Sequence, residues 1–363
     1  MRIILITGGA GFIGSNFVNF WHHNNKDDQL TILDALTYAG TISSIKHLID
    51  DNKITFIRGD ICNKELVSDI FSDHAIDTVI NFAAESHVDR SIASPDDFLQ
   101  TNILGTHTLL SVAYNSWKED FSNKKYHHIS TDEVYGDLGV EDPAFTEKTP
   151  YAPRSPYAAT KASSDHLVRA YNITYGLPVT ITNCSNNYGP FHFPEKLIPL
   201  VITNALDGKP LPIYGTGMNV RDWLYVEDHC RAIAVVLDKG RSGETYNVGG
   251  DNEITNIDLV KLICNLLDAR LESSPELLSN FPKCSVANRL KSESLIQFVK
   301  DRPGHDRRYA INAAKISVEL GFEPGVDFTT GINLTLDWYL QNEHWWRAIQ
   351  VGEHQSWIEQ HYG

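Results

Sequence analysis

The 363-residue sequence has few basic residues, scattered cysteines and no long apolar run. Its 31 lysines and arginines face 46 aspartates and glutamates, and the net charge of −15 repels a polyanion over most of the surface, which excludes nucleic-acid binding. No run approaches the roughly 18 apolar residues of a membrane helix. No cleavage-like site follows the apolar start either, so neither export nor a membrane location is expected.

The five cysteines form no Cys-x-x-Cys pair. They therefore indicate neither a disulfide framework nor a zinc site, and a reducing cytoplasm is the expected compartment. No spacing typical of a metal site occurs among the histidines, so no metal is expected. Several histidines and the late tryptophans are expected to pack in the core or lie on the surface: His22, His23, His127, His128, Trp338, Trp345, Trp346 and Trp357.

The N-terminal residues predict a dinucleotide site. Residues 2–7 form a short aliphatic run without alternation, typical of a strand covered on both faces in a parallel sheet. Gly8, Gly11 and Gly14 follow, and a helical pattern starts at Ser15. In such a turn the first glycine reverses the backbone, the second lets it approach a pyrophosphate, and the third lets the helix pack on the strand. An ordinary glycine-rich turn is the alternative.

A second strand-like run, residues 30–33, ends in Asp34. A carboxylate there would accept hydrogen bonds from the adenosine ribose hydroxyls and repel a 2′-phosphate. The position therefore favours NAD over NADP as the cofactor. A simple turn residue at a strand end is the alternative.

Strand-like runs recur with helical segments between them, at residues 54–57, 78–82 and 126–130. This alternation predicts an α/β fold with a doubly wound parallel sheet of the Rossmann type, with ligands at the carboxyl ends of the strands. At those ends Asp60 and Ile61 are expected to flank an adenine. Ala83 and Ala84 are small enough to let a cofactor lie over them. Strand-end packing is the alternative for all four residues.

Five residues have the chemistry of proton and hydride transfer. Thr131, Asp132 and Glu133 follow the run 126–130, and Tyr157 and Lys161 lie one helical turn apart. An ammonium near a phenol, together with the positive nicotinamide ring, favours a phenolate that can take a proton from a substrate alcohol. Adjacent carboxyls in a closed pocket tend to have pKa values pushed apart, as one acid and one base require. The alternatives are a chance Tyr-x-x-x-Lys and a solvated acidic turn.

Two helices are expected from capping and periodicity. Ser155 and Pro156 predict the start of a helix that ends before Gly176. The segment 96–117 carries an apolar stripe in steps of four and three. Because this stripe and the outer face of the 155–175 helix would expose apolar area in a monomer, we expect a homodimer. The stripe consists of Leu99, Ile103, Thr106, Leu110 and Ala113.

Six segments between residue 2 and about residue 340 carry a resemblance to one known family. They are ILITGGAGFIG, NFAAESHVDRS, HHISTDEVYGD, SPYAATKASSDHLV, NCSNNYGPFHFPEKLIPL and DRPGHDRRYAI. They resemble the extended short-chain dehydrogenase/reductase family, and within it the nucleotide-sugar 4,6-dehydratases. The resemblance implies a Rossmann domain with NAD over residues 1–185 and a smaller mixed α/β substrate domain over residues 186–363. The chain is expected to cross between the two.

The resemblance also implies a reaction on a hexose. Tyr157, with Lys161 and Thr131, would deprotonate the carbon 4 hydroxyl as hydride leaves. Glu133 would then remove the carbon 5 proton, and protonated Asp132 would donate to the departing carbon 6 hydroxyl before hydride returns to carbon 6. Epimerases of the family usually lack this acid pair, and a decarboxylase typically has serine at the aspartate position, so the pair selects a dehydratase.

The resemblance implies a nucleotide sugar as the partner, with dTDP-glucose as the expected one. UDP-glucose remains an alternative, since one pyrimidine methyl is worth only about 1–3 kcal/mol of discrimination. A catalytically idle NAD-binding regulator is a further alternative, although such relatives usually lose the tyrosine or the lysine.

The C-terminal half predicts the rest of the substrate site. Lys196 and Arg221 are expected to meet a diphosphate, while Pro212 and Tyr214 offer an apolar and aromatic surface to a pyrimidine. For Arg302 a salt-bridged loop residue is the alternative. The resemblance adds cofactor contacts at Phe12, Ile13, Thr101, Tyr157, Lys161 and Asn187, and substrate contacts at Ser86, His87, Thr131, Asn186, Leu197, Asn256, Arg302 and His305.

Overall fold

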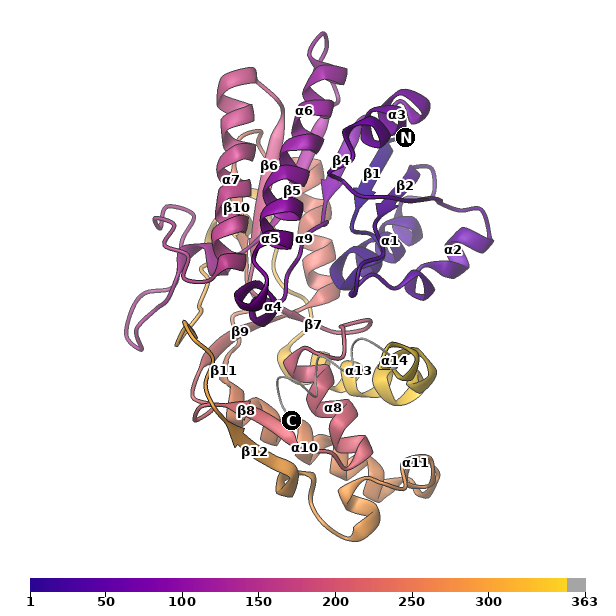
Figure 1. Ribbon diagram of the computed structural model, residues 1–363, viewed down its shortest axis with the longest axis vertical. Helices are drawn as coiled ribbons and strands as arrows, with labels where there is room; N and C mark the ends of the chain where they lie inside the picture. Colours follow the sequence, from indigo (N-terminus) through magenta and orange to yellow (C-terminus); the bar gives the residue numbers. More distant parts are fainter. Residues whose placement is uncertain (351–363) are drawn as a thin grey trace.

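The computed structural model describes residues 1–350. Residues 351–363 at the end of the predicted second domain, which include Trp357, lie outside the described residues. The chain forms two lobes, an N-terminal one built on a large sheet and a smaller one below it in Figure 1. Within the described part, no helix is long and apolar enough to span a membrane.

A seven-stranded sheet in the order β10-β6-β5-β4-β1-β2-β3 forms the centre of the upper lobe. All of its pairings are parallel, which confirms the predicted doubly wound α/β fold. The five strands expected from the sequence are present, and β6 and β10 complete the sheet. Its strands are β1 (Ile3–Thr7), β2 (Gln29–Asp34), β3 (Thr55–Arg58), β4 (Thr78–Asn81), β5 (Lys125–Thr131), β6 (Val179–Cys184) and β10 (Thr245–Val248).

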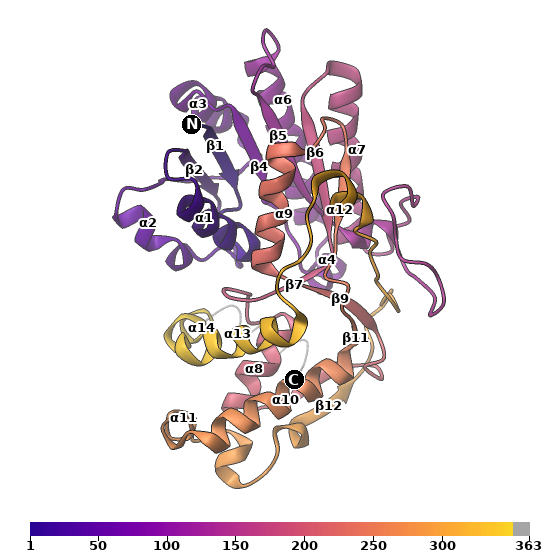
Figure 2. The ribbon, with the colours of Figure 1, turned by 180° about the vertical axis from the view of Figure 1, so that it is seen from behind.

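Helices cover both faces of this sheet, as the two opposite views in Figures 1 and 2 show. Along β1, Leu5 packs under α3 (Lys64–His74), α6 (Thr106–Trp117) and α7 (Pro156–Tyr175), whereas Ile4 and Ile6 pack against the other layer. Burial on both sides explains why the first strand shows no polar alternation. The other layer consists of α1 (Phe12–Asn24), α9 (Val226–Lys239) and α12 (Ala314–Leu320).

The helix predicted at 155–175 is confirmed. Ser155 accepts a hydrogen bond from the Ala158 N–H at 3.1 Å, Pro156 occupies the first turn, and Gly176 ends the helix in the left-handed conformation with φ of 72°. Because the first turn is fixed in this way, Tyr157 and Lys161 are placed at the sheet edge where β5 ends.

The apolar stripe predicted on 96–117 is only partly correct. The segment divides into α5 (Asp96–Phe98), a π-helical stretch (Leu99–Gly105) and α6. Thr106 and Leu110 are buried in the chain's own core, whereas Leu99 and Leu104 are 47% and 50% exposed. A π-helix has a wider turn than an α-helix, so side chains before and after it do not continue one stripe.

The lower lobe has its own apolar core and two small sheets. The strand orders are β11-β9-β7 and β12-β8. The chain enters this lobe after β6, returns to the upper sheet for α9 and β10, and re-enters at β11. Its strands are β7 (Asn186–Tyr188), β8 (Leu211–Tyr214), β9 (Val220–Tyr225), β11 (Glu253–Thr255) and β12 (Ile296–Val299). Its helices are α8 (Leu197–Asp207), α10 (Asn256–Ser273), α11 (Pro275–Asn280), α13 (Phe328–Gln341) and α14 (Glu343–Ile349). The short elements α2 (Lys46–Asp50), α4 (Val88–Ala93) and the 3-10 turn η3 (Asp132–Tyr135) belong to the upper lobe.

Candidate active site

A cavity of about 430 Å³ lies where the carboxyl ends of the parallel strands face the lower lobe. Such a crevice is where open α/β sheets bind ligands. Every site residue predicted from the sequence lines this cavity, from the glycine turn at one end to His305 at the other. Residues separated by almost 300 positions along the chain therefore share one pocket.

The glycine turn has the geometry of a dinucleotide site. Gly8 has φ of 68°, and a Cβ on Gly14 would lie 2.1 Å from the Gly8 carbonyl oxygen, so neither position tolerates a side chain. A Cβ on Gly11 would meet only that same oxygen, at 3.3 Å, which leaves this part of the backbone open. No side chain caps the N-terminus of α1 and no acid lies in its first turn. Its free N–H groups suit the pyrophosphate of NAD.

Asp34 combines two roles that the sequence left as alternatives. Its Oδ2 accepts the Ala10 N–H at 2.8 Å and its Oδ1 accepts the Leu36 N–H at 2.8 Å, so the carboxylate fixes the glycine turn. It also lines the cavity, where its remaining lone pairs are available to ribose hydroxyls. Burial raises the pKa of Asp34 above its ordinary value, and the two N–H donors oppose that rise.

The remaining cofactor residues surround the turn. Asn187 is held by His229, whose Nδ1 lies 3.0 Å from its Oδ1, and by the Ser185 carbonyl, which accepts from its Nδ2 at 2.9 Å. The ring of His192 stacks on Phe12 at 4.2 Å between centroids. Other predicted cofactor residues that line the same end are Ile13, Asp60, Ile61, Ala83, Ala84 and Thr101.

Tyr157 is buried in the cavity wall beside Thr131. Burial raises the pKa of the Tyr157 phenol well above its ordinary value, and Glu133 adds to the rise. From the sequence, the Lys161 ammonium and the positive nicotinamide ring together are expected to lower the pKa of this phenol. Positive charge from both Lys161 and a bound nicotinamide is required to offset the burial.

The acid pair is buried at the end of β5. Thr131 caps the following 3-10 turn by accepting the Glu133 N–H at 3.3 Å, and its hydroxyl lies 3.3 Å from Asp132 Oδ1. Burial, then Glu133, then Asp222 raise the pKa of Asp132 well above its ordinary value. Burial also raises the pKa of Glu133, but Arg302 and Arg221 oppose it. The two carboxyls therefore sit in environments suited to a protonated acid and an ionised base.

The substrate end carries three cationic side chains. Lys196 Nζ donates to the Ser86 carbonyl at 3.1 Å, and Arg302 Nη1 lies 3.3 Å from Asp89 Oδ1. Tyr214 OH donates to the same Asp89 at 3.1 Å. Arg221 stacks over the Tyr309 ring, with its Cζ 4.2 Å from the ring centroid. These cations face a cavity with the polarity that a diphosphate requires.

Several polar atoms along this wall are buried without a hydrogen-bond partner. They are Asp132 Oδ2, Asn186 Oδ1, Trp223 Nε1, Asn256 Oδ1 and Arg302 Nε, all from cavity-lining residues. A buried polar group left unsatisfied costs about 1–3 kcal/mol, so their concentration here indicates a place for a polar ligand. Leu197, Pro212 and His305 complete the wall.

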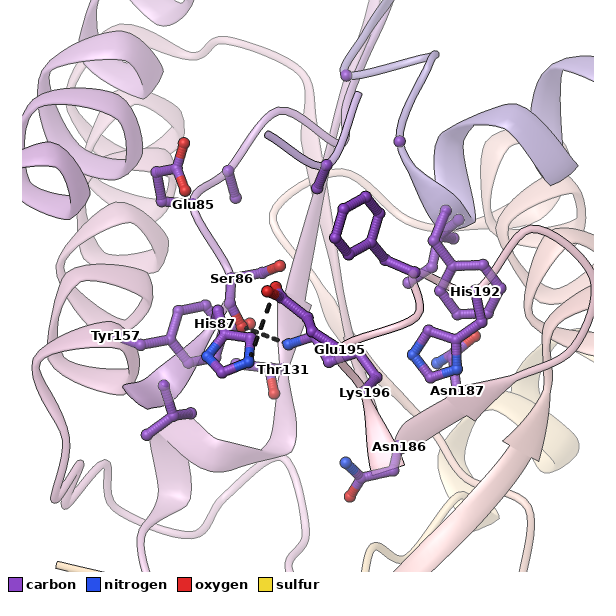
Figure 3. Close-up of a pocket in the computed structure, with 18 of the residues that line it drawn as sticks. Glu85, Ser86, His87, Thr131, Tyr157, Asn186, Asn187, His192, Glu195 and Lys196 are labelled. Carbon is purple, nitrogen blue, oxygen red and sulfur yellow. Dashed lines mark hydrogen bonds and ion pairs between the residues drawn. The ribbon is translucent and has the colours of Figure 1, made fainter. Parts of the chain in front are cut away.

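Sequence reasoning missed an ion cluster in the middle of the cavity. Glu195 is buried, with Oε2 3.1 Å from Arg90 Nη2 and Oε1 3.7 Å from His87 Nε2, and Arg90 packs 3.9 Å from the Tyr38 ring centroid. Figure 3 shows Ser86, His87, Glu195 and Lys196 gathered at the pocket centre. Only the position of Glu195 directly before Lys196 could have indicated it.

In the described part of the chain, no group of histidine, cysteine or carboxylate residues is arranged to hold a metal ion.

Comparisons with known proteins cover nearly the whole chain. The family model described as GDP-mannose 4,6 dehydratase matches residues 5–335. The chain is 54% identical over 371 aligned positions to a dTDP-glucose 4,6-dehydratase from Salmonella typhimurium, covering 99% of this chain and 98% of that protein.

Solved structures show the same likeness. The dTDP-glucose 4,6-dehydratase of Bacillus anthracis, solved in complex with NAD, is 45% identical with a TM-score of 0.83, covering 96% of this chain and all of that one. A dTDP-glucose 4,6-dehydratase of Streptomyces venezuelae, also solved with NAD, is 43% identical with a TM-score of 0.85 and the same coverage.

Proposed function

The chain belongs to the GDP-mannose 4,6 dehydratase family of extended short-chain dehydrogenases/reductases, and we propose that it is an NAD-dependent hydro-lyase that converts dTDP-glucose to dTDP-4-keto-6-deoxyglucose and water. The observation that carries the proposal is the buried Asp132–Glu133 pair. It shares one cavity with Tyr157, Lys161 and an NAD-type glycine turn. A simple dehydrogenase or an epimerase needs no such acid and base.

In the first step Tyr157, as phenolate, takes the proton of the carbon 4 hydroxyl while hydride leaves the same carbon. Thr131 donates a hydrogen bond to that oxygen, and Lys161 stabilises the phenolate. When bound, NAD supplies the hydride acceptor, and it gives the hydride back at the end of the cycle. The new ketone at carbon 4 acidifies the hydrogen on carbon 5.

In the second step Glu133 removes the carbon 5 proton and Asp132 gives its proton to the departing carbon 6 hydroxyl. One proton is taken, one is given, and water leaves, so the elimination is balanced. Burial keeps Asp132 protonated, whereas Arg302 and Arg221 keep Glu133 closer to an ionised base. Hydride then adds to carbon 6 and a proton returns to carbon 5, where Glu133 can give back the proton it removed. The proton taken by Tyr157 replaces, by exchange with solvent, the one given by Asp132, so the cycle closes and no reduced cofactor is released.

The other end of the cavity holds the nucleotide. Lys196, Arg221 and Arg302 bind the diphosphate, and Pro212 with Tyr214 contacts the pyrimidine. The relatives support thymine as the base, because at 54% and 45% identity they are dTDP-glucose 4,6-dehydratases. A preference for dTDP-glucose over UDP-glucose predicts at least about 10-fold higher kcat/KM, since one buried methyl is worth about 1–3 kcal/mol.

The test is to incubate the purified protein with dTDP-glucose and, separately, with UDP-glucose, and to measure the 4-keto product and released NADH. We expect product from dTDP-glucose with no accumulation of free NADH. Equal kcat/KM for the two sugars contradicts the choice of substrate. Release of NADH in step with product contradicts the dehydratase cycle.

A homodimer belongs to the same proposal. Ile92, Leu99, Leu104, Ile173 and Tyr175 are 39% to 83% exposed. They lie on α4, the π-helical stretch and α7, and the first two of these elements both contact α7. An exposed apolar group of this kind is typical of an interface. A monomer mass at micromolar concentration contradicts the dimer, and Leu104→Glu is expected to weaken it.

Two further assignments complete the proposal. The five cysteines are free, which suits a reducing cytoplasm. Residues 1–185 act as the cofactor domain and residues from 186 onward as the substrate domain, with α9, β10 and α12 crossing back to the sheet of the cofactor domain.

A further inference from the structure

Lys161 contacts a buried polar cluster of which only Ser130 lines the cavity. Asp165, one helical turn further along α7, accepts hydrogen bonds from Ser130 Oγ at 2.9 Å and Tyr151 OH at 2.8 Å. His128 Nε2 lies 3.5 Å from Asp165 Oδ1 and 3.4 Å from Lys161 Nζ. Lys161, Asp165 and His128 are almost completely buried. This cluster consists of Ser130, Tyr151, His128 and Asp165.

Within the cluster Asp165 carries the negative charge. His128 Nδ1 lies 3.2 Å from the Asn81 amide nitrogen, and its Nε2 faces both Asp165 and Lys161. Burial lowers the pKa of His128 well below its ordinary value, so the ring is neutral. Burial raises the pKa of Asp165 above its ordinary value, but Lys161, the Tyr151 and Ser130 hydroxyls and Arg169 oppose that rise and favour the ionised carboxylate.

Asp165 differs from the other acids near Lys161. Asp132 and Glu133 exchange protons during the proposed reaction, so neither can serve as a constant counter-charge. Asp165 touches neither the cavity nor the reacting atoms, because it does not line the pocket. Its charge can therefore remain fixed through the cycle.

We propose that Asp165 is a positioning residue for the first hydride transfer: held by Ser130 and Tyr151, its carboxylate is the fixed counter-charge that keeps Lys161 an ammonium while Tyr157 is a phenolate. The inference rests on the proposed function, in which Tyr157 takes the proton of the carbon 4 hydroxyl. Lys161 itself donates to the Ile129 carbonyl at 2.7 Å, which orients the ammonium but supplies no charge.

Electrostatics of the surrounding elements agree with this role. Burial lowers the pKa of Lys161 to about 8, and Asp165 opposes that shift more than Cys184 does. Cys184 on β6 is a neutral thiol, because burial raises its pKa to about 12. Other titratable groups surround Lys161 and Asp165: His128 on β5, Asp132, Glu133 and Tyr135 in the turn after it, Tyr151 on the loop before α7, and Tyr157 and Arg169 on α7.

The direct test is the ionisation of Tyr157 in Asp165→Asn. The phenolate is titrated by ultraviolet absorbance, with NAD present, as the difference between each protein and its matching Tyr157→Phe partner. Without the Asp165 carboxylate, Lys161 is expected to lose its proton at lower pH, so the Tyr157 titration should move to higher pH by on the order of one unit. The acid limb of single-turnover NADH formation should move in parallel, and Asp165→Glu should restore both.

Asp268→Asn is the matched control. Asp268 is equally buried, accepts hydrogen bonds from the Ser292 hydroxyl and N–H, and lies on α10 in the other lobe. It should lose stability without a change in either pH profile. An Asp165→Asn protein that is merely slower at every pH, with the Tyr157 titration unmoved, overturns the proposal.

If Asp165→Asn does not fold, Tyr151→Phe provides the same test, because it removes a donor to Asp165 without changing charge. A smaller shift in the same direction is expected, and an unmoved titration again overturns the proposal. The optical titration does not depend on turnover. If the wild-type protein acts on no nucleotide sugar, the proposed function is wrong. The optical titration still tests the role of Asp165, so the two failures can be told apart.

Discussion

At the scale of single residues, buried charges in the cavity serve the reaction at the expense of stability. Asp132 Oδ2 has no hydrogen-bond partner, and its carboxyl is surrounded by Glu133 and Asp222. A structural carboxylate would instead be paired or saturated with donors, as Asp268 is by Ser292. An unpartnered acid whose protonated form is favoured fits a proton donor waiting for substrate.

This arrangement predicts that Asp132→Asn stabilises the protein as pH rises. The pKa of Asp132 is raised in the folded state, so its contribution is fully present below the unfolded pKa of about 4 and is lost as pH rises toward the folded value. Asparagine does not titrate, so the variant should gain unfolding free energy relative to wild type between pH 4 and neutrality.

Urea unfolding at several pH values measures this difference. Asp251→Asn, which removes the same charge from an exposed position, is the control and should show no such trend. A constant difference between Asp132→Asn and wild type across the range would show that the carboxyl titrates as it does in the unfolded chain.

Asp34→Ala is expected to weaken the binding of NAD more than the binding of NADP. The variant loses the acceptor for the ribose hydroxyls and the charge that repels a 2′-phosphate. The lost hydrogen bond to a charged group should reduce the binding free energy of NAD by roughly 1.5–3 kcal/mol. It also loses the bonds to Ala10 and Leu36, so both affinities fall. Asp77→Ala is the control, because Asp77 accepts the Ile3 N–H outside the cavity. Calorimetric titration of the variant with NAD and with NADP measures both affinities. An unchanged ratio of the two affinities would show that Asp34 only stabilises the glycine turn.

At the scale of elements, local chemistry determined what could be predicted from the sequence. The strand before Gly8 and the helix begun by Ser155 and Pro156 follow from short-range rules of burial and capping, and both are present. The π-helical stretch at Leu99–Gly105 could not be predicted, because only tertiary packing of α7 against this segment decides where an extra residue enters the turn.

The candidate site shows the same difference between residues with a local sequence pattern and pairs that form only in the folded chain. Tyr157, Lys161 and the acid pair have recognisable spacing, whereas the Glu195 and Arg90 pair joins positions 105 residues apart. The roles of β10 and α9 in the upper sheet were also hidden, because the chain leaves for the lower lobe and returns. Long-range pairing of this kind has no signature within one sequence window.

The glycine turn predicts different outcomes for two similar substitutions. Gly14→Ala should lower the melting temperature and abolish NAD binding, since its Cβ would lie 2.1 Å from the Gly8 carbonyl oxygen. Gly11→Ala should leave the melting temperature within a few degrees but weaken NAD binding, because the added methyl would point into the space kept for the pyrophosphate. Thermal unfolding with and without NAD distinguishes them. Equal loss of stability in both variants would contradict these separate roles.

At the scale of the whole molecule, two lobes bring the cofactor and the sugar nucleotide together over one acid–base set. The upper lobe contributes Tyr157, Asp132 and Glu133, and the lower lobe contributes Arg221 and Arg302. The lower-lobe arginines also oppose the rise in the pKa of Glu133, so the base depends on both lobes. Oxidation requires the upper lobe, whereas elimination requires the junction between the two.

The central claim is that oxidation at carbon 4 and elimination across carbons 5 and 6 are separate steps with separate residues. Single-turnover spectra of Glu133→Gln mixed with dTDP-glucose test it most directly. We predict that bound NADH forms and persists with a 4-keto hexose, while the 4-keto-6-deoxy product falls by on the order of 10²–10⁴ in rate, as expected for loss of a general base. Tyr157→Phe, in contrast, should form neither. Product formation by Glu133→Gln at the wild-type rate, without accumulation of NADH, would contradict the account.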